Sequence, residues 1–415
     1  MPDSLWPKWA ARLLAARTFF LVVVAATVAM PFNIALNGGA IIGLVAASLG
    51  LGLARAKASL PRPGFGAAVP GLMALLFFLY LASYCYTDMQ WLWPNLETRL
   101  ALLAFPLAFW AAPPSRAEQD IAAFWFVMSI SLLAILAEVF ALVQYMREPH
   151  GYFFVGSSLL VPFGLHRVYL SVHTLVALVL LTLEGRAWAK GIWYRLWQLL
   201  LVLFIAVLAS RLMALNLLLL GCAYATLLLL KGKRKTALVL AGTLVSAAAL
   251  ALSIPYTRQI LTDFHLIRTD WGTPQTVDGK DSMQIRYWVW KTAQTELQNA
   301  PWHGYGGGAA RFKLQDHYLA MDFKVASADV LDPHNQYLAM LLDLGYPGLA
   351  VLLLLLAAGL WQGLRLRDGV AATVFFVAAI AMVTECYLDA QKGIVFFSLM
   401  WAMLGSRTRQ PLAET

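Results

Sequence analysis

Residues 336–361, QYLAMLLDLGYPGLAVLLLLLAAGLW, decide the fold class of this chain. A helix of about 20 apolar residues crosses a lipid bilayer, and this stretch is long enough to do so. The polar segment DPHN precedes it, so a water-exposed loop enters the membrane here. Pro333 suits the first turn of a helix, which would place His334 in that turn at the membrane surface.

Eleven further segments have a comparable apolar content, which predicts about twelve transmembrane helices in one bundle. Segments 194–210 and 212–230 are separated because Arg211 is too costly to leave in the middle of a bilayer. The other segments are 13–31, 34–54, 67–84, 98–112, 120–146, 165–183, 236–254, 370–388 and 393–406. We therefore expect an all-α integral membrane protein.

The composition also indicates a lipid environment. Hydrophobic residues make up 60% of the 415-residue chain and charged residues only 13%. Soluble domains are about half apolar and about a quarter charged. The net charge of +9 is explained by loops on one side of a membrane, so we expect no nucleic acid partner.

Basic residues gather in alternate loops, and such loops lie on the cytoplasmic side. With the N-terminus inside, every alternate loop agrees with this rule, so both termini are expected in the cytoplasm. Basic residues precede the first apolar segment and no A-x-A site follows closely, which indicates an uncleaved helix rather than a signal peptide. Cys85, Cys222 and Cys386 lie in or beside apolar segments, and their odd number argues against a disulfide framework.

One loop differs from the others in its length and polarity. Residues 255–335 lie on the non-cytoplasmic side in this topology. The loop separates residues 1–254, with nine predicted helices, from residues 336–415, with three helices and a cytoplasmic tail. Its length and polarity make it the expected place for the chemistry of the protein.

Short helices are expected within this loop. Residues 281–299, DSMQIRYWVWKTAQTELQN, have apolar side chains near helical spacing. This pattern predicts an amphipathic helix that lies on the bundle. The sequence PWHGYGGG at 301–308 predicts a Gly-rich turn, and a second short helix is expected through 309–320.

Two arginines fall on the outer side of the membrane in this topology. Arg211 opens the apolar sequence SRLMALN, and Arg286 opens an R-Y-x-x-W run with Tyr287 and Trp290. Arginine binds lipid phosphate well, and Tyr and Trp suit the headgroup layer. Each arginine has a plainer alternative, as a snorkelling side chain for Arg211 and as a solvated charge on an amphipathic helix for Arg286.

His334 is a candidate base because an unperturbed histidine titrates near pH 6.5 and accepts a proton at neutral pH. A capping or interfacial histidine fits the same position equally well. Gly304 and Gly306 would let backbone N–H groups approach a phosphate or a sugar. A plain tight turn fits this glycine pattern at least as well.

Further polar side chains fall on the same side of the membrane as the long loop. We consider them candidate substrate contacts, together with Tyr287, Trp290, Gly304 and Gly306. These residues are Arg147, His166, Arg167, Tyr169, Asn335, Asp389 and Lys392.

Several catalytic motifs are absent from the sequence. There is no D-x-D pair to hold a metal against a pyrophosphate, no H-E-x-x-H, no G-x-S-x-G and no Rossmann fingerprint. A sugar transfer would then need arginines to neutralise the leaving phosphate. The candidate groups face away from cytosolic nucleotides, so the donor would be lipid-carried. We predict neither a metal nor another cofactor.

Four motifs in this order resemble the O-antigen ligase/polymerase superfamily of bacterial inner membranes. They are S-R at 210–211, R-Y-x-x-W at 286–290, PWHGYGGG at 301–308 and H-N-x-x-L at 334–338. The resemblance covers about 200–345 by motif and the rest by helix count and loop placement. The size, without an extra C-terminal soluble domain, is most similar to the O-antigen ligases that finish lipopolysaccharide.

The resemblance implies a membrane-embedded glycosyltransferase with the C-type architecture. Its donor would be O-antigen polysaccharide on undecaprenyl pyrophosphate, and its acceptor a sugar hydroxyl of lipid A–core. The family's essential histidine matches His334, the general base, and its two essential arginines match Arg211 and Arg286, which would bind the pyrophosphate. The transfer would be a metal-independent, single inverting displacement by a monomer among membrane lipids. Asp332 or Asp389 is a candidate to orient the histidine.

Two other readings of the sequence remain open. An O-antigen polymerase or a protein O-oligosaccharyltransferase of the same superfamily would share the donor and differ in the acceptor. A transporter of lipid-linked oligosaccharide would carry charges near the bilayer midplane. Glu138 and Glu385 are the main mid-helix charges, and such carboxylates are functional candidates.

Overall fold

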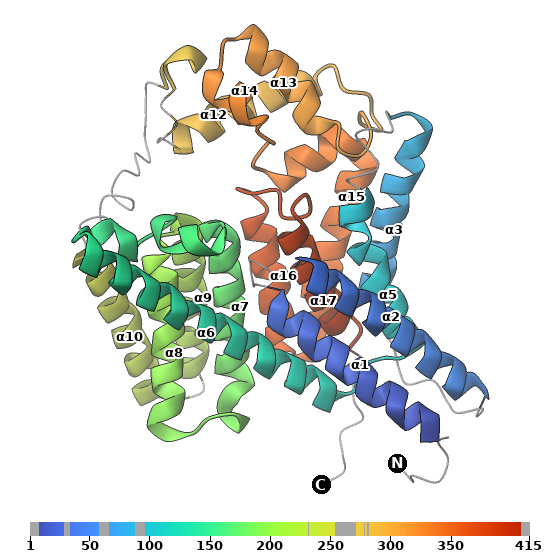
Figure 1. The fold of residues 1–415 in the computed structure, drawn as a ribbon, viewed down its shortest axis with the longest axis vertical. Coiled ribbons are helices and arrows are strands. Elements are labelled where there is room, and N and C mark those ends of the chain that lie inside the picture. Colours follow the sequence, from blue (N-terminus) through green and yellow to red (C-terminus); the bar gives the residue numbers. More distant parts are fainter. Residues whose placement is uncertain are drawn as a thin grey trace. The chain divides into compact units, whose positions relative to one another are not determined.

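The computed structural model describes residues 8–28, 34–57, 66–87, 96–230, 232–253, 271–277, 279 and 282–407. All the regular secondary structure in these residues is helical, and they contain no strand (Figure 1). Both chain termini and residues 255–270 of the predicted loop lie outside the described residues.

Each of the twelve predicted segments contains an α-helix. The helices are α1 (Lys8–Thr27), α2 (Ile34–Lys57), α3 (Ala68–Ala82), α5 (Ala101–Ala111), α6 (Arg116–Arg147), α7 (Arg167–Leu183), α8 (Gly191–Val207), α9 (Arg211–Leu230), α10 (Arg234–Ser253), α15 (Gln336–Leu366), α16 (Gly369–Ala381) and α17 (Gln391–Gly405). Within the described residues, the four helices at 36–57, 68–85, 116–147 and 336–366 are long and apolar enough to cross a membrane. These helices support a multi-pass membrane protein, while the count of twelve crossings stays a prediction.

The chain folds as two compact units, each built from separate stretches of sequence. The first, which we name the site unit, comprises the described residues of Ser48–Pro113 and Ile267–Thr415. The second unit comprises those of Pro7–Ala47 and Pro114–Leu266.

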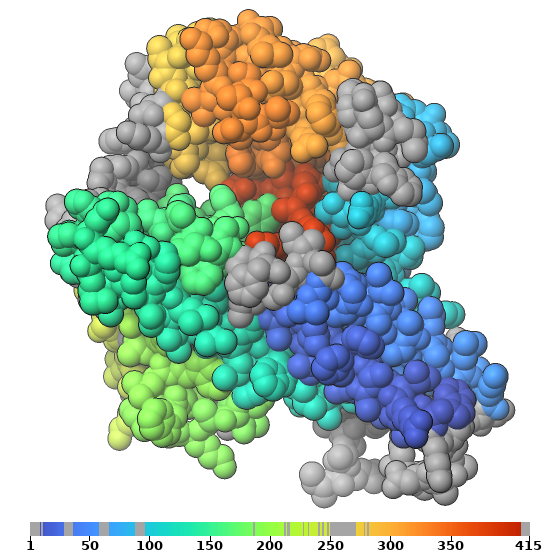
Figure 2. All heavy atoms as spheres, viewed as in Figure 1, coloured from blue at the N-terminus to red at the C-terminus, as the bar shows by residue number. Residues whose placement is uncertain are grey.

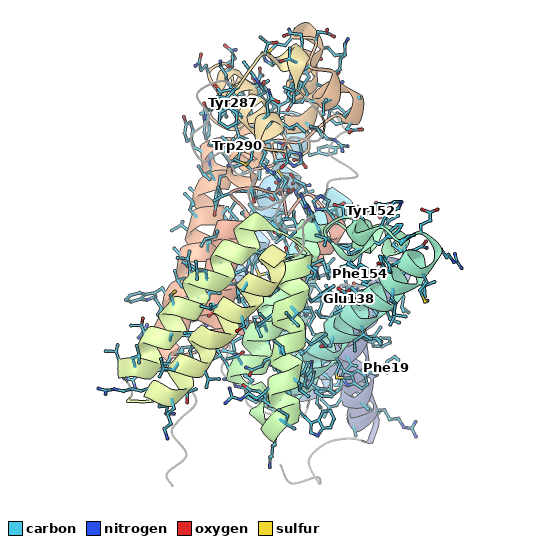
Figure 3. The ribbon with its side chains drawn as sticks, turned by 90° about the vertical axis from the view of Figure 1, so that its left-hand side faces the viewer. Phe19, Glu138, Tyr152, Phe154, Tyr287 and Trp290 are labelled. Carbon is cyan, nitrogen blue, oxygen red and sulfur yellow. The ribbon has the colours of Figure 1, made fainter. Side chains whose placement is uncertain are left out.

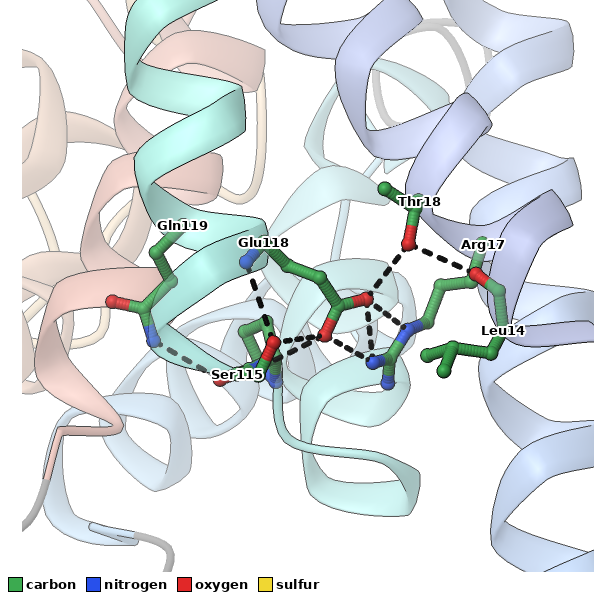
Figure 4. Close-up of polar contacts among 7 residues, drawn as sticks. Leu14, Arg17, Thr18, Ser115, Glu118 and Gln119 are labelled. Atoms are coloured by element: carbon green, nitrogen blue, oxygen red, sulfur yellow. Dashed lines mark hydrogen bonds and ion pairs between the residues drawn. The ribbon is translucent and has the colours of Figure 1, made fainter. Parts of the chain in front are cut away.

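In the second unit, α1 packs along α6, and α6 to α10 pack on one another. A buried ion pair joins the first two of these helices (Figure 4). Arg17 Nη2 donates to both carboxylate oxygens of Glu118 at 2.7 and 2.6 Å. Ser115 caps α6, and its hydroxyl and backbone N–H both donate to Glu118 Oε2 at 2.9 Å. The carboxylate of Glu118 therefore links the start of α6 to α1.

In the site unit, α15 packs against α3, α16 and α17, and α17 packs against α5. The course of α15 breaks at Gly345, whose φ is 62° and ψ is −155°, and Pro347 follows two residues later. Proline cannot donate the next helical hydrogen bond, and glycine tolerates a positive φ, so these two residues favour a break at this point. The break separates the first turns of α15 from its long apolar part.

Three short helices of the predicted loop form a body with an apolar core of its own. They are α12 (Ser282–Leu297), α13 (Ala310–Ala320) and α14 (Lys324–Asp329), which we call the helical cap. Val289 of α12, Leu314 of α13 and Ala326 of α14 are buried together with Leu342 of α15. Figure 2 shows the cap as one continuous surface, coloured yellow to orange. The helices predicted at 281–299 and 309–320 correspond to α12 and α13.

The helix predicted over 370–388 is shorter than expected. α16 ends at Ala381, and residues 382–390 form consecutive turns that we call the 382–390 segment. Gln336 of α15 holds both ends of this segment: its N–H donates to the Met382 carbonyl at 2.8 Å, and its Oε1 accepts from the Leu388 N–H at 2.6 Å. Glu385 is therefore outside a helix, which corrects the sequence-based placement.

Candidate active site

His334 lies directly before α15 rather than in its first turn. Asn335 is the N-cap, and its Oδ1 accepts from the N–H groups of Tyr337 and Leu338 at 2.9 and 3.1 Å. His334 has a φ of 44°, and its N–H donates to Asp332 Oδ1 at 2.7 Å. The prediction that Pro333 opens the helix is thus wrong, because the asparagine side chain satisfies the first free N–H groups of the helix.

Two carboxylates face one nitrogen of the His334 ring. Nδ1 lies 3.4 Å from Asp332 Oδ1 and 3.4 Å from Glu385 Oε2. The side chain of Glu385 is only 5% exposed, whereas that of Asp332 is 35% exposed. The buried carboxylate is therefore the stronger partner, since water screens it less.

The same Glu385 carboxylate pairs with Arg286 of α12. Arg286 Nη2 donates to Glu385 Oε1 at 2.8 Å, while Oε2 is the oxygen that faces His334. Longer contacts of 3.4 Å join Arg286 Nε to the Thr384 carbonyl and Nη1 to the Ser282 carbonyl. Glu385 thus bridges the candidate base and a candidate phosphate-binding arginine, and it brings together side chains from the cap, the start of α15 and the 382–390 segment.

The charges around His334 change its proton affinity. Burial acts to lower the pKa of His334, but the hydrogen bond to Glu385 and the negative charges of Asp332 and Glu385 outweigh it. The positive charge of Arg286 acts in the opposite direction to the carboxylates. The result is a pKa raised above the ordinary value of 6.5. Such a histidine gains a proton readily and holds it against a carboxylate.

Asp389, the other carboxylate considered for orienting His334, pairs with Arg99 instead. Arg99 precedes α5, and its side chain is fully buried. Asp343 of α15 lies 3.8 Å from the same guanidinium, and the Tyr80 ring stacks below it at 4.0 Å. Asp389 therefore belongs to a second charge cluster in the site unit, centred on the buried Arg99.

The glycines of PWHGYGGG pack against the break in α15. Gly304 has a φ of 77°, and an added Cβ would lie 2.4 Å from the Asp343 carbonyl oxygen. Gly306 has a φ of 101°, and its N–H donates to the same carbonyl oxygen at 2.8 Å. Gly345 would place a Cβ 2.0 Å from the Trp302 carbonyl oxygen. Close backbone packing therefore explains why glycine stands at these positions. This agrees with the tight turn, the alternative that the sequence left open.

The aromatic candidates on α12 take different positions (Figure 3). Tyr287 stacks on Trp271, with ring centroids 4.5 Å apart and an interplanar angle of 7°. Trp290 packs against the apolar core of the cap. Lys392, another predicted substrate contact, is the second residue of α17 and is half-buried.

The remaining predicted residues belong to the second unit. Arg147 is the exposed last residue of α6, and the His166 ring at the start of α7 meets the Tyr169 ring edge-on at 5.6 Å. Glu138 lies within α6 and is half-buried (Figure 3). Arg167 and Arg211 are the first residues of α7 and α9.

Sequence reasoning missed Arg99 and the place of Glu385. Arg99 stands at the edge of a short apolar segment, where a snorkelling charge is the usual explanation. The sequence held one indication that Glu385 lies outside a helix. Carboxylates stand at both 385 and 389, and a helix in lipid accommodates such a pair poorly. Within the described residues, no group of three or more His, Cys, Asp or Glu side chains is arranged to hold a metal ion.

The apolar helices define a multi-pass α-helical membrane protein. Its site unit holds a candidate base, a carboxylate and an arginine in one cluster, as enzyme active sites do. Residues 196–353 match the family model described as O-antigen ligase. The resemblance to the O-antigen ligase superfamily that the motifs indicated is thus confirmed over these residues. The matched stretch includes Arg211, Arg286 and His334. A search of curated proteins finds no match.

Proposed function

We propose that this protein is an O-antigen ligase at the periplasmic face of the bacterial inner membrane. It transfers O-antigen polysaccharide from undecaprenyl pyrophosphate to a sugar hydroxyl of lipid A–core. The observation that carries the proposal is the Glu385 carboxylate, which contacts Arg286 at 2.8 Å and His334 at 3.4 Å. A base and a phosphate-binding cation are held side by side by one buried acid, as a glycosyl transfer from a diphosphate requires.

His334 acts as the general base in this mechanism. With its Nδ1–H donating to Glu385 Oε2, the lone pair of Nε2 accepts the proton of the acceptor hydroxyl. The carboxylates then stabilise the imidazolium that forms. Positioned proton transfer of this kind contributes roughly 10²–10⁴-fold to a rate.

Arg286 and Arg211 act on the leaving group. The acceptor oxygen attacks the anomeric carbon, the bond from that carbon to the pyrophosphate oxygen breaks, and undecaprenyl pyrophosphate leaves with the electron pair. A guanidinium binds phosphate oxygens through two parallel hydrogen bonds and offsets the charge that develops on them. A single displacement of this kind inverts the anomeric configuration.

The location at a membrane interface suits both substrates. Donor and acceptor are each anchored in the outer leaflet of the inner membrane, so a site between helices at that surface meets both at high effective concentration. The apolar surface of the long helices keeps the site at this level of the bilayer.

The test is ligation in reconstituted liposomes. Purified protein is mixed with undecaprenyl-pyrophosphate-linked O-antigen and lipid A–core in the presence of EDTA, and laddered lipopolysaccharide is read on a gel. Wild type runs beside His334→Ala and beside His150→Ala, a matched control at an exposed histidine of the second unit. A ladder from wild type and His150→Ala that His334→Ala loses supports the ligase.

Other outcomes identify the alternatives. Longer lipid-linked glycan without a ladder indicates an O-antigen polymerase, and glycan on Ser or Thr of an added protein indicates a protein O-oligosaccharyltransferase. Movement of the donor across the bilayer without a new glycosidic bond indicates a transporter. Equal ladders from wild type and His334→Ala would remove His334 as the base.

A further inference from the structure

Arg99 is the centre of a charge cluster that the proposed chemistry does not use. Its side chain is fully buried, and Nη2 pairs closely with Asp389 Oδ1. Asp343 Oδ2 lies 3.8 Å away, and the guanidinium stacks over the Tyr80 ring at 4.0 Å. A buried guanidinium carries a large desolvation cost that only well-placed acidic partners offset. A snorkelling arginine would instead reach water.

The partners of Arg99 lie in three parts of the site unit. Asp343 of α15 also accepts the Ala310 N–H at 2.9 Å through Oδ1, which fixes the start of the cap helix α13. Tyr80 belongs to α3, and its hydroxyl contacts Met340 of α15 at 3.7 Å. Asp389 closes the 382–390 segment. Arg99 therefore joins the break in α15 to the end of the segment that carries Glu385.

The 382–390 segment depends on contacts with other elements for its position. It is a series of turns without a continuous helix, and Gln336 holds it at Met382 and at Leu388. The ion pair of Asp389 with Arg99 is the charged anchor at its far end. Glu385 lies between these anchors, so the direction of its carboxylate depends on both ends of the segment.

We propose that Arg99 is a positioning residue for the transfer reaction, because it anchors the 382–390 segment and thereby holds Glu385 against His334 and Arg286. Arg99 contacts neither His334 nor Arg286 in this scheme. It acts through Asp389 and the three residues that separate Asp389 from Glu385. The expected effect on the transfer rate rests on the proposed function. The effect on the position of Glu385 against His334 does not depend on any substrate.

Proton affinities support the arrangement. Burial raises the pKa of Asp389, and the positive charge of Arg99 acts in the opposite direction. Removal of Arg99 would therefore raise the pKa of Asp389 further, and the ion pair that anchors the segment would be lost. The contact from Glu385 to His334 would then loosen, together with the support that it gives to the His334 proton.

The decisive measurement is the titration of His334 in the full-length protein. The chain has seven histidines, and ¹⁵N-histidine NMR in detergent resolves the His334 signal by its absence from His334→Gln. In Arg99→Gln we expect the titration midpoint of His334 to fall. A residue that only stabilises the fold would lower the melting temperature and leave this midpoint unchanged.

Activity provides the second readout. In liposome ligation, misplacement of the segment by Arg99→Gln should lower kcat by on the order of 10²-fold, while KM for the lipid-linked donor changes little. Arg99→Lys retains the charge and should recover part of both the midpoint and the rate. If wild type shows no ligation, the proposed function fails, but the NMR titration still tests the positioning role.

Asp389→Asn is the second variant, because Arg99→Gln removes a fully buried charge and can prevent folding. It keeps Arg99 beside Asp343 and removes only the charged anchor on the segment. A lower His334 midpoint in Asp389→Asn supports the proposal. A wild-type midpoint together with wild-type kcat in a folded Arg99→Gln or Asp389→Asn overturns it.

Discussion

His334 and Glu385 are 51 residues apart in the chain, yet Nδ1 of the first and Oε2 of the second lie 3.4 Å apart. The histidine precedes α15, and the acid comes from the turns after α16. The second oxygen of the same carboxylate contacts Arg286 at 2.8 Å. Proton uptake and phosphate binding therefore share one buried group, and substitutions of Glu385 and of Arg286 should shift the pKa of His334 in opposite directions.

Glu385→Gln should lower kcat by on the order of 10²–10⁴-fold, because the neutral amide no longer stabilises the imidazolium. A general base works only when it is unprotonated, so ligation falls as the pH drops through the pKa of His334. The negative charge of Glu385 raises that pKa, so its loss should move the acid limb of the kcat/KM profile to lower pH. An unmoved acid limb would show that Asp332 alone governs the histidine.

Arg286→Gln should move the same acid limb to higher pH. The guanidinium opposes protonation of His334, so its removal raises the pKa of the histidine further. The variant should also raise KM for the pyrophosphate-linked donor, since an amide neutralises no phosphate charge. Profiles of kcat/KM for this variant and for Glu385→Gln, measured in the same liposomes, give the direction of each shift. Shifts in the same direction would contradict the bridging arrangement.

The raised pKa of His334 also affects stability. A group with a higher pKa in the folded than in the unfolded protein contributes stability below its unfolded value near 6.5, and this contribution is lost as the pH rises through the folded value. The melting temperature in detergent should therefore decline as the pH rises above about 6.5. His334→Gln should show a smaller decline over this range. Parallel declines in the two proteins would rule out this linkage.

Gly304→Ala should destabilise the site unit by about 1–3 kcal/mol, because the added methyl group meets the backbone of α15. The new Cβ would lie 2.4 Å from the Asp343 carbonyl oxygen at a φ of 77°. Gly279→Ala is a matched control in the same loop, since its Cβ would meet only Val325 at 3.9 Å. Melting temperatures of both variants check this expectation, and equal losses would argue against close packing at Gly304.

Glu118→Gln should destabilise the second unit by about 3–5 kcal/mol, because it leaves Arg17 as a buried charge without its acid. The side chains of both residues are less than 10% exposed, at 6% for Arg17 and 7% for Glu118. Glu148→Gln is the control, at an exposed glutamate that follows the other end of α6. Chemical unfolding in detergent compares the two variants. A loss below about 1 kcal/mol, as for an exposed pair, would contradict the burial of this ion pair.

Long apolar stretches made most of the helices predictable from the sequence. The segments at 34–54 and 120–146 contain continuous helices, because an apolar stretch long enough to cross the lipid satisfies its backbone hydrogen bonds best as a helix. The segment at 370–388 differed, since Thr384, Glu385 and Asp389 find partners in tertiary contacts with α12 and Arg99. Such partners come from distant parts of the chain, so local composition does not reveal them.

The candidate site was predictable only in part. His334 and Arg286 stood out by their motifs, and the structure places both against one carboxylate. Asp332 was a candidate from the sequence and lies 3.4 Å from the ring, whereas the approach of Glu385 was not predictable, because it depends on the turns after α16. Arg211 is the first residue of α9, and its role stays a proposal.

The position of the 382–390 segment in the chain has a consequence for biosynthesis. A ribosome releases the cap helices before α15, α16 and the turns that follow, and membrane proteins are inserted largely in that order. The acid that joins His334 to Arg286 therefore leaves the ribosome after both of its partners. A nascent chain stalled after α16 would hold the candidate base and the α12 arginine without the group that joins them, so the site becomes complete only once the 382–390 segment has been made.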